Sequence, residues 1–418
     1  MNENLPTPLM HSRDDVTGLV LSGGGARAAY QVGVLHQLAK WFDQEDRREF
    51  DFPFKILCGT SAGAINAAAL VCAGRNFYQS TDRMMRVWEN FRSEQVFRSD
   101  SLGIIRTGAR WLSALSIGWM LRKRPKCLLD NSPLAHLLHE LLHFRRLDEA
   151  LENGTIRALA VTASSYSSGR NVTFFQSLDA IESWSRTLRV ALPDRITVQH
   201  LLASAAIPFV FPAVKLEIDG HTEHFGDGSI RQLAPISPAI HLGANKVMVI
   251  GSSQSENDHT KLMDVRDAYP SLAQIAGHAM ASIFLDSLSI DIERLSRVNK
   301  TLSLLPPEMA SKTTLKPVEL LVISPSERID EIAARHTQDL PRPVRTMLSA
   351  LGATEASGSS LASYLLFESN YTRELIRMGM ADTIAKRDEV YAFFGLGQKG
   401  LEHQRQQQPV LQGVRLAQ

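Results

Sequence analysis

A serine between glycines is the first feature of the sequence that could do chemistry. The pentapeptide Gly59-Thr60-Ser61-Ala62-Gly63 follows the apolar run 54–58 and precedes an alanine-rich stretch that ends at Ala73. Glycines two positions before and after a serine let the chain turn sharply from a strand into a helix, which exposes the hydroxyl at the helix N-terminus. The pattern predicts a nucleophilic Ser61. In an ordinary strand-to-helix turn, the same serine would be only a helix N-cap.

A glycine-rich loop precedes this serine in the chain. It lies between an apolar run at 16–21 and a helical pattern at 26–41, and it consists of Gly23, Gly24, Gly25, Ala26, Arg27 and Ala28. Backbone N–H groups of such a loop can hold an oxyanion. The loop also matches the dinucleotide fingerprint GxGxxG/A, but that site needs an acid at the end of the second strand, where this chain has Cys58 and Gly59. The oxyanion interpretation is therefore favoured.

The segment His139-Glu140-Leu-Leu-His143 is a literal HExxH sequence, the signature of zinc proteases. Over a predicted helix at 133–144, the leucines lie on one face, and the histidines lie with Glu140 on the opposite face. No third-ligand motif follows. The segment is thus interpreted as the solvated face of an amphipathic helix, and the sequence predicts neither a metal site nor a cofactor.

Strands and helices alternate around these motifs. Strands are predicted at 16–21, 54–58, 156–162, 172–175, 214–218, 246–251 and 318–324, and further helices at 272–297 and 361–384. Repetition of strand, glycine turn and helix is typical of an α/β protein with a mostly parallel sheet.

The predicted organisation has one catalytic unit. A polar leader (1–15) precedes a catalytic α/β domain (16–251), a mainly helical C-terminal extension (252–398) packs on it, and a polar tail (399–418) follows. No linker rich in proline, glycine or serine divides the chain convincingly.

Composition excludes several classes of protein. The chain has 45 Lys+Arg against 44 Asp+Glu, and this balance argues against a nucleic-acid partner. Three cysteines in 418 residues cannot build a disulfide framework and favour a cytoplasmic protein. The first 15 residues lack the pattern of a secretory signal, and no uncharged apolar run is long enough for a membrane span.

Four motifs in order make the sequence resemble a bacterial patatin-like phospholipase. The glycine loop is followed, 38 positions after Gly23, by Ser61 in its pentapeptide. The segment Ala203-Ser-Ala-Ala-Ile-Pro208 resembles the family's Ser-x-x-x-Pro motif, and Asp227-Gly228-Ser229 resembles its Asp-Gly-Gly/Ala motif. The resemblance covers about residues 16–251. It implies a patatin-like three-layer α/β/α fold with a mostly parallel central sheet and a mainly helical C-terminal extension.

The resemblance also implies a Ser–Asp dyad without histidine. Ser61 would attack an ester carbonyl, and Asp227 would accept its proton and later activate water. The N–H groups of Gly24, Gly25 and Ala26 would hold the oxyanion. Because an aspartate has an ordinary pKa of about 3.9, the site should be partly desolvated to raise that pKa. Arg27 would orient the loop or meet a phosphate, unless it is a surface residue of the first helical turn.

Two positions depart from the family pattern. Ala28 stands where the glycine loop usually ends in glycine, and Ser229 stands where the aspartate motif usually ends in glycine or alanine. Both residues are small, so the geometry is expected to survive. Ser229 could add a hydrogen bond near Asp227 and alter its basicity.

The substrate class follows from the resemblance: carboxylic esters of phospholipids, lysophospholipids or acylglycerols. Residues 103–126 combine Trp111 and Trp119 with basic side chains, a pattern that predicts peripheral contact with the inner membrane face. A core-packed helix with a solvated basic end, or a subunit interface, fits this pattern too. The sequence does not indicate the oligomeric state.

Two other functions also fit parts of the sequence. One is a catalytically weak, patatin-like lipid-binding scaffold, which is disfavoured because Ser61 and Asp227 both stand in their motifs. The other is an α/β-hydrolase esterase, which needs a catalytic histidine late in the chain. The available histidines lack a recognisable setting; they are His241, His259, His278 and His336.

Overall fold

The computed structural model describes residues 15–44, 52–98, 127–252, 275, 282–310, 312–350 and 359–397. The predicted membrane-contact segment 103–126, the polar tail, His259 and His278 lie outside these residues. Within the part of the chain that the structure describes, no helix is long and apolar enough to cross a membrane.

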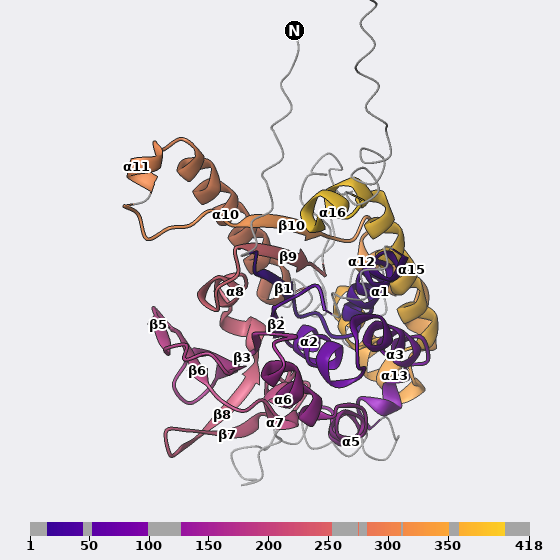
Figure 1. The fold of residues 1–418 in the computed structure, drawn as a ribbon. Helices are drawn as coiled ribbons and strands as arrows, with labels where there is room; N and C mark the ends of the chain where they lie inside the picture. The colour runs from indigo at the N-terminus through magenta and orange to yellow at the C-terminus, as the bar shows by residue number, and fades with distance from the viewer. Residues whose placement is uncertain are drawn as a thin grey trace, which may run out of the picture.

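A ten-stranded sheet runs through the middle of the described chain (Figure 1). Its strands are β1 (Thr17–Leu21), β2 (Ile56–Thr60), β3 (Ala158–Ser165), β4 (Asn171–Ser177), β5 (Trp184–Arg186), β6 (Arg189–Pro193), β7 (Val214–Ile218), β8 (His221–Asp227), β9 (Lys246–Ile250) and β10 (Glu319–Ile323). The strand order is β10-β9-β1-β2-β3-β4-β6-β5, with β8 paired to β3 and β7. The strands from β10 to β3 are mutually parallel, and β4, β5, β7 and β8 add antiparallel pairs.

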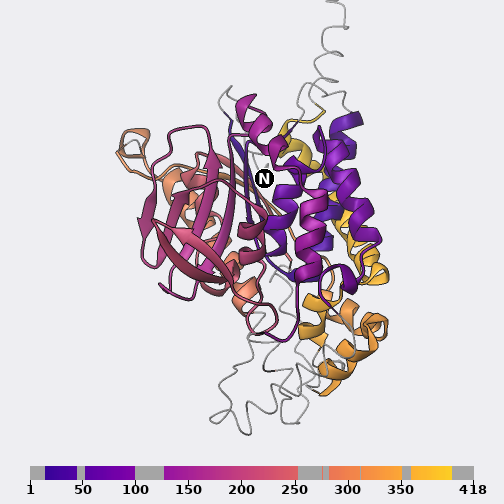
Figure 2. The same ribbon diagram turned by 90° about the horizontal axis from the view of Figure 1, so that it is seen from below.

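Helices cover both faces of this sheet because the central strands are apolar on both sides. Leu19 and Leu21 of β1 pack into one core, whereas Val20 between them packs into the other. The first core holds residues from α1 (Ala29–Gln44), α2 (Ala62–Cys72), α3 (Phe77–Glu89) and α15 (Ser369–Ala385). The second holds residues from α8 (Ser237–His241) and α10 (Ser287–Ser303). Figure 2 shows the larger helical layer on one side of the strands. The predicted three-layer α/β/α fold is confirmed.

The remaining helices have four to ten residues. They are α5 (Ser132–Leu141), α6 (Phe144–Glu152), α7 (Val198–Ser204), α11 (Pro307–Ala310), α12 (Ile329–His336), α13 (Arg342–Ala350), α14 (Ser359–Leu365) and α16 (Arg387–Phe394). A 3₁₀ turn, η1 (Gly25–Ala28), precedes α1.

Residues beyond 252 pack directly on the first part of the chain. Strand β10 extends the sheet by pairing with β9, and α15 lies along α1. The two helices approach closely at glycines: a Cβ added at Gly33 would lie 2.1 Å from the Ile376 carbonyl oxygen, and one at Gly379 would lie 2.3 Å from that of Tyr30. The predicted boundary at 251–252 remains a prediction.

Three helix predictions are corrected by the structure. The predicted helix 133–144 is wrong beyond Leu141, because Leu142 is extended (φ −100°, ψ 113°) and separates α5 from α6. The predicted helix 361–384 is two helices, α14 and α15, because Glu368 between them is also extended. The predicted helix 26–41 begins as the 3₁₀ turn η1.

Candidate active site

Strand register brings the separate motifs to one edge of the sheet. β1 and β2 are parallel, with Leu21 opposite Gly59, so the glycine loop and Ser61 leave from neighbouring strand ends. On the other side of β2, Thr60 lies opposite Thr162 of β3. β8 runs antiparallel to β3 and places Asp227 opposite Ala163, one residue further on. Because β4 pairs with the other edge of β3, β2 and β8 share one edge of β3. Ser61 and Asp227, 166 positions apart in the chain, therefore meet where these two strands end.

Ser61 occupies a sharp turn between β2 and α2. Its backbone has φ 56° and ψ −131°, and its side chain is 1% exposed. A left-handed backbone at a residue with a Cβ is strained, so the surrounding contacts must hold it. A Cβ at Gly59 would lie 2.4 Å from Ala64 Cα, and one at Gly63 would lie 2.3 Å from the Leu21 carbonyl oxygen. Only glycine fits either position, which explains the small residues on both sides of the serine.

Ser204 of the Ser-x-x-x-Pro segment holds this turn in place. The Ser61 N–H donates to Ser204 Oγ at 2.8 Å, and Ser204 Oγ donates to the Thr162 carbonyl oxygen at 2.6 Å. Ser204 is fully buried at the end of α7. The sequence marked this segment as a motif but assigned the serine no role.

Asp227 is a fully buried carboxyl group at the end of β8. Its Oδ1 accepts the Ser229 N–H at 2.9 Å, while Oδ2 makes no hydrogen bond to any described residue. Burial raises the pKa of Asp227 to about 7, and the Ser61 hydroxyl and Ser229 act in the opposite direction with smaller effect. A carboxyl group that titrates near neutral pH suits a general base.

The rest of the aspartate motif fits tightly around this carboxyl group. A Cβ at Gly228 would lie 2.0 Å from the Thr162 carbonyl oxygen, so this position also requires glycine. Asn171 Nδ2 donates to the Gly228 carbonyl oxygen at 2.8 Å. These contacts fix the chain immediately after Asp227.

The glycine loop ends in the 3₁₀ turn η1, which begins at Gly25. Gly25 has φ 56°, and a Cβ there would lie 2.3 Å from the Tyr364 carbonyl oxygen. Ser252 Oγ donates to the Gly23 carbonyl oxygen at 2.7 Å and holds the other side of the loop. The first N–H groups of a helical turn have no acceptor within it. Gly25 and Ser61 line the same cavity.

Arg27 fastens the loop to helix α14. It is 3% exposed, so the surface interpretation of Arg27 is wrong. Its Nε donates to Ser363 Oγ at 2.7 Å, its Nη2 donates to Ser360 Oγ at 3.4 Å, and its Cζ lies 4.4 Å from the centre of the Tyr364 ring. The guanidinium therefore orients the glycine loop from the C-terminal part of the chain.

A buried chain of hydrogen bonds links the glycine loop to α2 and α3. Trp88 Nε1 donates to Asn66 Oδ1 at 3.1 Å, and Asn66 Nδ2 donates to Gln31 Oε1 at 3.0 Å and to the Ala28 carbonyl oxygen at 3.1 Å. Gln31 Nε2 donates to the Ser22 carbonyl oxygen at 2.8 Å. Sequence reasoning missed this chain. Its only signal was a polar Asn66 in an otherwise apolar helix.

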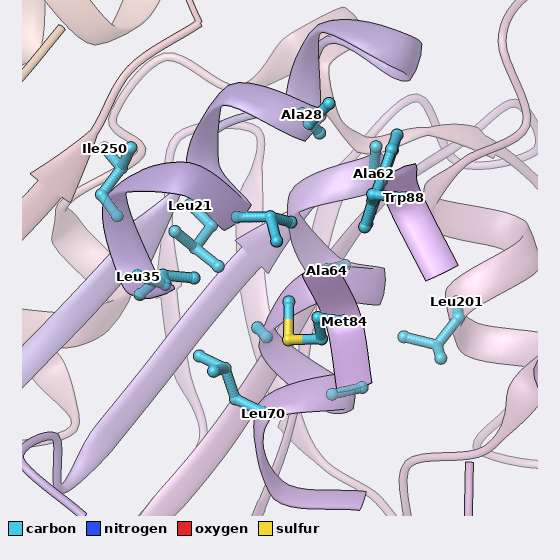
Figure 3. Close-up of a cluster of buried hydrophobic side chains, with 14 of the residues drawn as sticks. Leu21, Ala28, Leu35, Ala62, Ala64, Leu70, Met84, Trp88, Leu201 and Ile250 are labelled. Atoms are coloured by element: carbon cyan, nitrogen blue, oxygen red, sulfur yellow. The ribbon is translucent and has the colours of Figure 1, made fainter. Parts of the chain in front are cut away.

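A cavity of about 510 Å³ opens beside Ser61. Its walls come mainly from α2, α3 and α5, and Phe211 and Phe367 close one side. Figure 3 shows three of its apolar lining residues, Ala62, Met84 and Trp88, among the buried side chains of this face of the sheet. A concave, mostly apolar pocket with a few polar groups is the usual form of a small-molecule site.

The structure does not assemble the HExxH segment as one helical face. His139 and Glu140 lie on α5, but His143 follows the end of that helix. Across the described ranges, no group of three or more His, Cys, Asp or Glu side chains could hold a metal ion.

Of the histidines that could serve an α/β-hydrolase mechanism, the structure describes His241 and His336, and both contact other residues. The ring of His241 lies 4.9 Å from that of Trp184, and His336 Nε2 lies 2.7 Å from Glu374 Oε2. Neither histidine lines the cavity with Ser61.

A strand–serine–helix turn, a glycine loop and a buried aspartate thus lie together at one edge of the sheet of an α/β/α protein. Residues 19–240, more than half of the chain, match the family model described as patatin-like phospholipase. The chain belongs to the patatin-like phospholipase family.

Two solved structures match the chain at low identity. Human GIVD cytosolic phospholipase A2, in complex with methyl gamma-linolenyl fluorophosphonate, is 13% identical with a TM-score of 0.43, and the match covers 94% of this chain and 60% of that one. VipD from Legionella pneumophila is 13% identical with a TM-score of 0.28, covering 87% of this chain and 67% of that one. The chain thus spans about three fifths of the human protein's length. No curated protein sequence matches it significantly.

Proposed function

We propose that this protein is a serine hydrolase that cleaves carboxylic esters of lipids, with Ser61 as nucleophile and Asp227 as base. The observation that carries the proposal is the position of Ser61: it lines an apolar cavity and lies beside a buried carboxyl group whose pKa is about 7. The family match supports the same class of reaction.

The proposed reaction proceeds through an acyl-enzyme. Asp227 takes the proton of the Ser61 hydroxyl as Oγ attacks the ester carbonyl carbon. The N–H groups of Gly24, Gly25 and Ala26 stabilise the negative oxygen of the tetrahedral intermediate, which collapses as the alcohol leaves with the proton. Asp227 then removes a proton from water, which attacks the acyl carbonyl carbon, and gives that proton to Ser61 Oγ as the bond to the acyl group breaks and the carboxylic acid departs.

The candidate substrates are acyl esters of phospholipids, lysophospholipids or acylglycerols. An apolar cavity next to the nucleophile suits the hydrocarbon part of such a molecule, since its burial is favourable. Contact of residues 103–126 with a lipid surface remains a prediction. A flotation assay with liposomes tests it, and unchanged binding after substitution of Trp111 and Trp119 would contradict it.

Labelling with a fluorophosphonate probe tests the proposed nucleophile. Wild type should be labelled and should hydrolyse a lipid panel, Ser61→Ala should do neither, and Asp227→Asn should be labelled slowly; a chelator should change none of these results. Ser80→Ala is the matched control, because Ser80 is also buried and its hydroxyl has no hydrogen-bond partner among the described residues. Unlabelled but folded wild type would favour the lipid-binding scaffold instead.

A further inference from the structure

The cavity beside Ser61 follows helix α2 along its whole length. From α2 and its C-cap, Ala62, Ile65, Ala69 and Ala73 line it, and the buried side chain of Asn66 lines it as well. Their spacing of three or four residues places them on one face of the helix. At 1.5 Å of rise per residue, this face extends ~18 Å from Ser61 to Ala73. The helix therefore forms a long, narrow floor of mainly small side chains.

Large apolar side chains form the opposite walls. Met84, Val87 and Trp88 come from α3, and Leu134, Leu137, Leu138 and Leu141 come from α5. The walls do not add a charged group near Ser61. With the floor, they give the cavity the shape of a mostly apolar channel along α2.

Charged residues mark the far end of this channel. The lining includes four polar residues, Arg83, Arg86, Glu140 and His143, and all four are exposed. Two of them can be placed by their contacts. Arg83 Nη1 donates to the carbonyl oxygen of Ala73, and the His143 N–H donates to that of Cys72 at 3.5 Å, so these residues lie around the C-terminal end of α2. The apolar lining thus begins at Ser61 and gives way to solvated charges near Ala73.

We infer that the channel binds the acyl chain of the ester along α2, with the carbonyl at Ser61 and the methyl end toward Ala73. Ala69 and Ala73 then determine which chain lengths are accepted. This inference rests on the proposed function and specifies its substrate as an ester with one long, unbranched acyl chain. The carbonyl must lie beside Ser61 and Gly25, and in the described ranges the apolar lining continues from there along α2.

The inference predicts a dependence of reaction rate on chain length. Each methylene group buried in the channel should increase kcat/KM about fourfold. The increase should stop once the chain reaches the charged end, because further methylene groups there are not removed from water. The wild-type profile should therefore rise and then level off.

Two substitutions should shorten the channel by different amounts. Leucine in place of Ala69 would block the floor ~12 Å from Ser61, and leucine in place of Ala73 would block it ~18 Å away. The measurement is kcat/KM for p-nitrophenyl esters of saturated acids of increasing length. In Ala69→Leu, kcat/KM for short esters should stay within about threefold of wild type, and kcat/KM for the longest esters should fall by about a hundredfold or more. In Ala73→Leu, the same loss should begin only with acyl chains that are ~6 Å longer.

Ala135→Leu is the matched control, because Ala135 is on α5 but does not line the cavity. It should keep the wild-type profile. If Ala69→Leu does not fold, as judged by its melting temperature, Ala69→Val makes the same test with a smaller group. Profiles of the Ala69 and Ala73 variants that match wild type would overturn the inference.

A binding assay separates failure of this inference from failure of the proposed function. Saturated fatty acids of graded length displace cis-parinaric acid from the Ser61→Ala protein, and Ala69→Leu added to that background should remove the binding of long acids selectively. If wild type hydrolyses no ester but Ala69→Leu still lowers the length limit for fatty-acid binding, the proposed function is refuted and the channel is retained. Hydrolysis with an unshifted limit in both assays would retain the function and refute the channel.

Discussion

The buried carboxyl group of Asp227 allows one substitution, Asp227→Asn, to test the chemistry of the site together with its effect on stability. Burial raises the pKa of this group from 3.8 to about 7. The difference of about three pH units corresponds to about 4 kcal/mol, at 1.36 kcal/mol per unit. This is an approximate free-energy cost of keeping the ionised carboxylate in the folded protein.

The sign of the pH effect follows from proton binding. Between pH 4 and pH 7 the folded protein keeps the Asp227 proton, whereas the unfolded chain has lost it. Because the folded state binds more protons, this group lowers the free energy of unfolding as pH rises through that window, and the loss levels off above pH 7. Asparagine has no proton to lose. Asp227→Asn should therefore be more stable than wild type at pH 8, by up to about 4 kcal/mol, and similar to it at pH 4.

Activity should respond in the opposite direction. In wild type, kcat/KM should rise about tenfold per pH unit below pH 7 and then level off, because Asp227 must be ionised to accept a proton. Asp227→Asn should lose about a hundred- to ten-thousandfold in kcat/KM at pH 8. The assays are urea unfolding from pH 4 to pH 8 and ester hydrolysis over the same range.

Asp291→Asn is the control for this experiment. Asp291 is a buried carboxyl group whose pKa burial also raises, and its Oδ2 accepts the Ile236 N–H at 2.9 Å in the core on the opposite face of the sheet. This variant should alter the pH dependence of stability but not that of kcat/KM. Lower stability of Asp227→Asn at pH 8, or a wild-type rate profile without an inflection near pH 7, would refute the reasoning.

Three further substitutions test how the surroundings hold the site. Ser204→Ala leaves the buried Ser61 N–H without its acceptor and should cost about 1–3 kcal/mol in urea unfolding together with a lower kcat. Gly25→Ala places a Cβ against the backbone of Tyr364 and should abolish labelling by a fluorophosphonate. Its control is Gly154→Ala, which is also at positive φ but has open space around the added Cβ. The control should lose only about 1–2 kcal/mol of stability and keep full labelling. Trp88→Phe removes one donor from the buried hydrogen-bond chain and should lower kcat more than it raises KM; an effect on melting temperature alone would show a purely structural role.

The strands of the sheet could be predicted from the sequence where the run of apolar residues is clear. The runs that became β1, β2 and β9 are apolar on both faces, and the strand–glycine–helix grammar around Ser61 is specific. Strand β8 was missed because its first residues, His-Thr-Glu-His, are polar, as expected for a hairpin partner of β7 that is exposed near its start. β5 and β6 were missed because they are short and largely solvent-facing.

The contacts that complete the candidate site depend on tertiary packing and carry little local signal. Nothing near Arg27 in the sequence indicates that Ser360 and Ser363 bind its guanidinium more than 330 positions later. Likewise, Ser204 becomes the acceptor for the Ser61 N–H only because α7 ends beside β3. A motif predicts which residues are needed, but the strand register and the packing of distant helices determine where they meet.

The C-terminal part of the chain is a structural component of the candidate site. The Tyr364 carbonyl oxygen can approach the glycine loop this closely only because Gly25 has no Cβ, and the Arg27 guanidinium lies over the ring of the same tyrosine. α15 packs along α1, the helix that follows the glycine loop, through a close approach at glycines. The loop that would stabilise the oxyanion is thus shaped from both sides, by the sheet through Ser252 and by α14 through Tyr364. A change in α14 should therefore alter catalysis through the loop without touching Ser61 or Asp227.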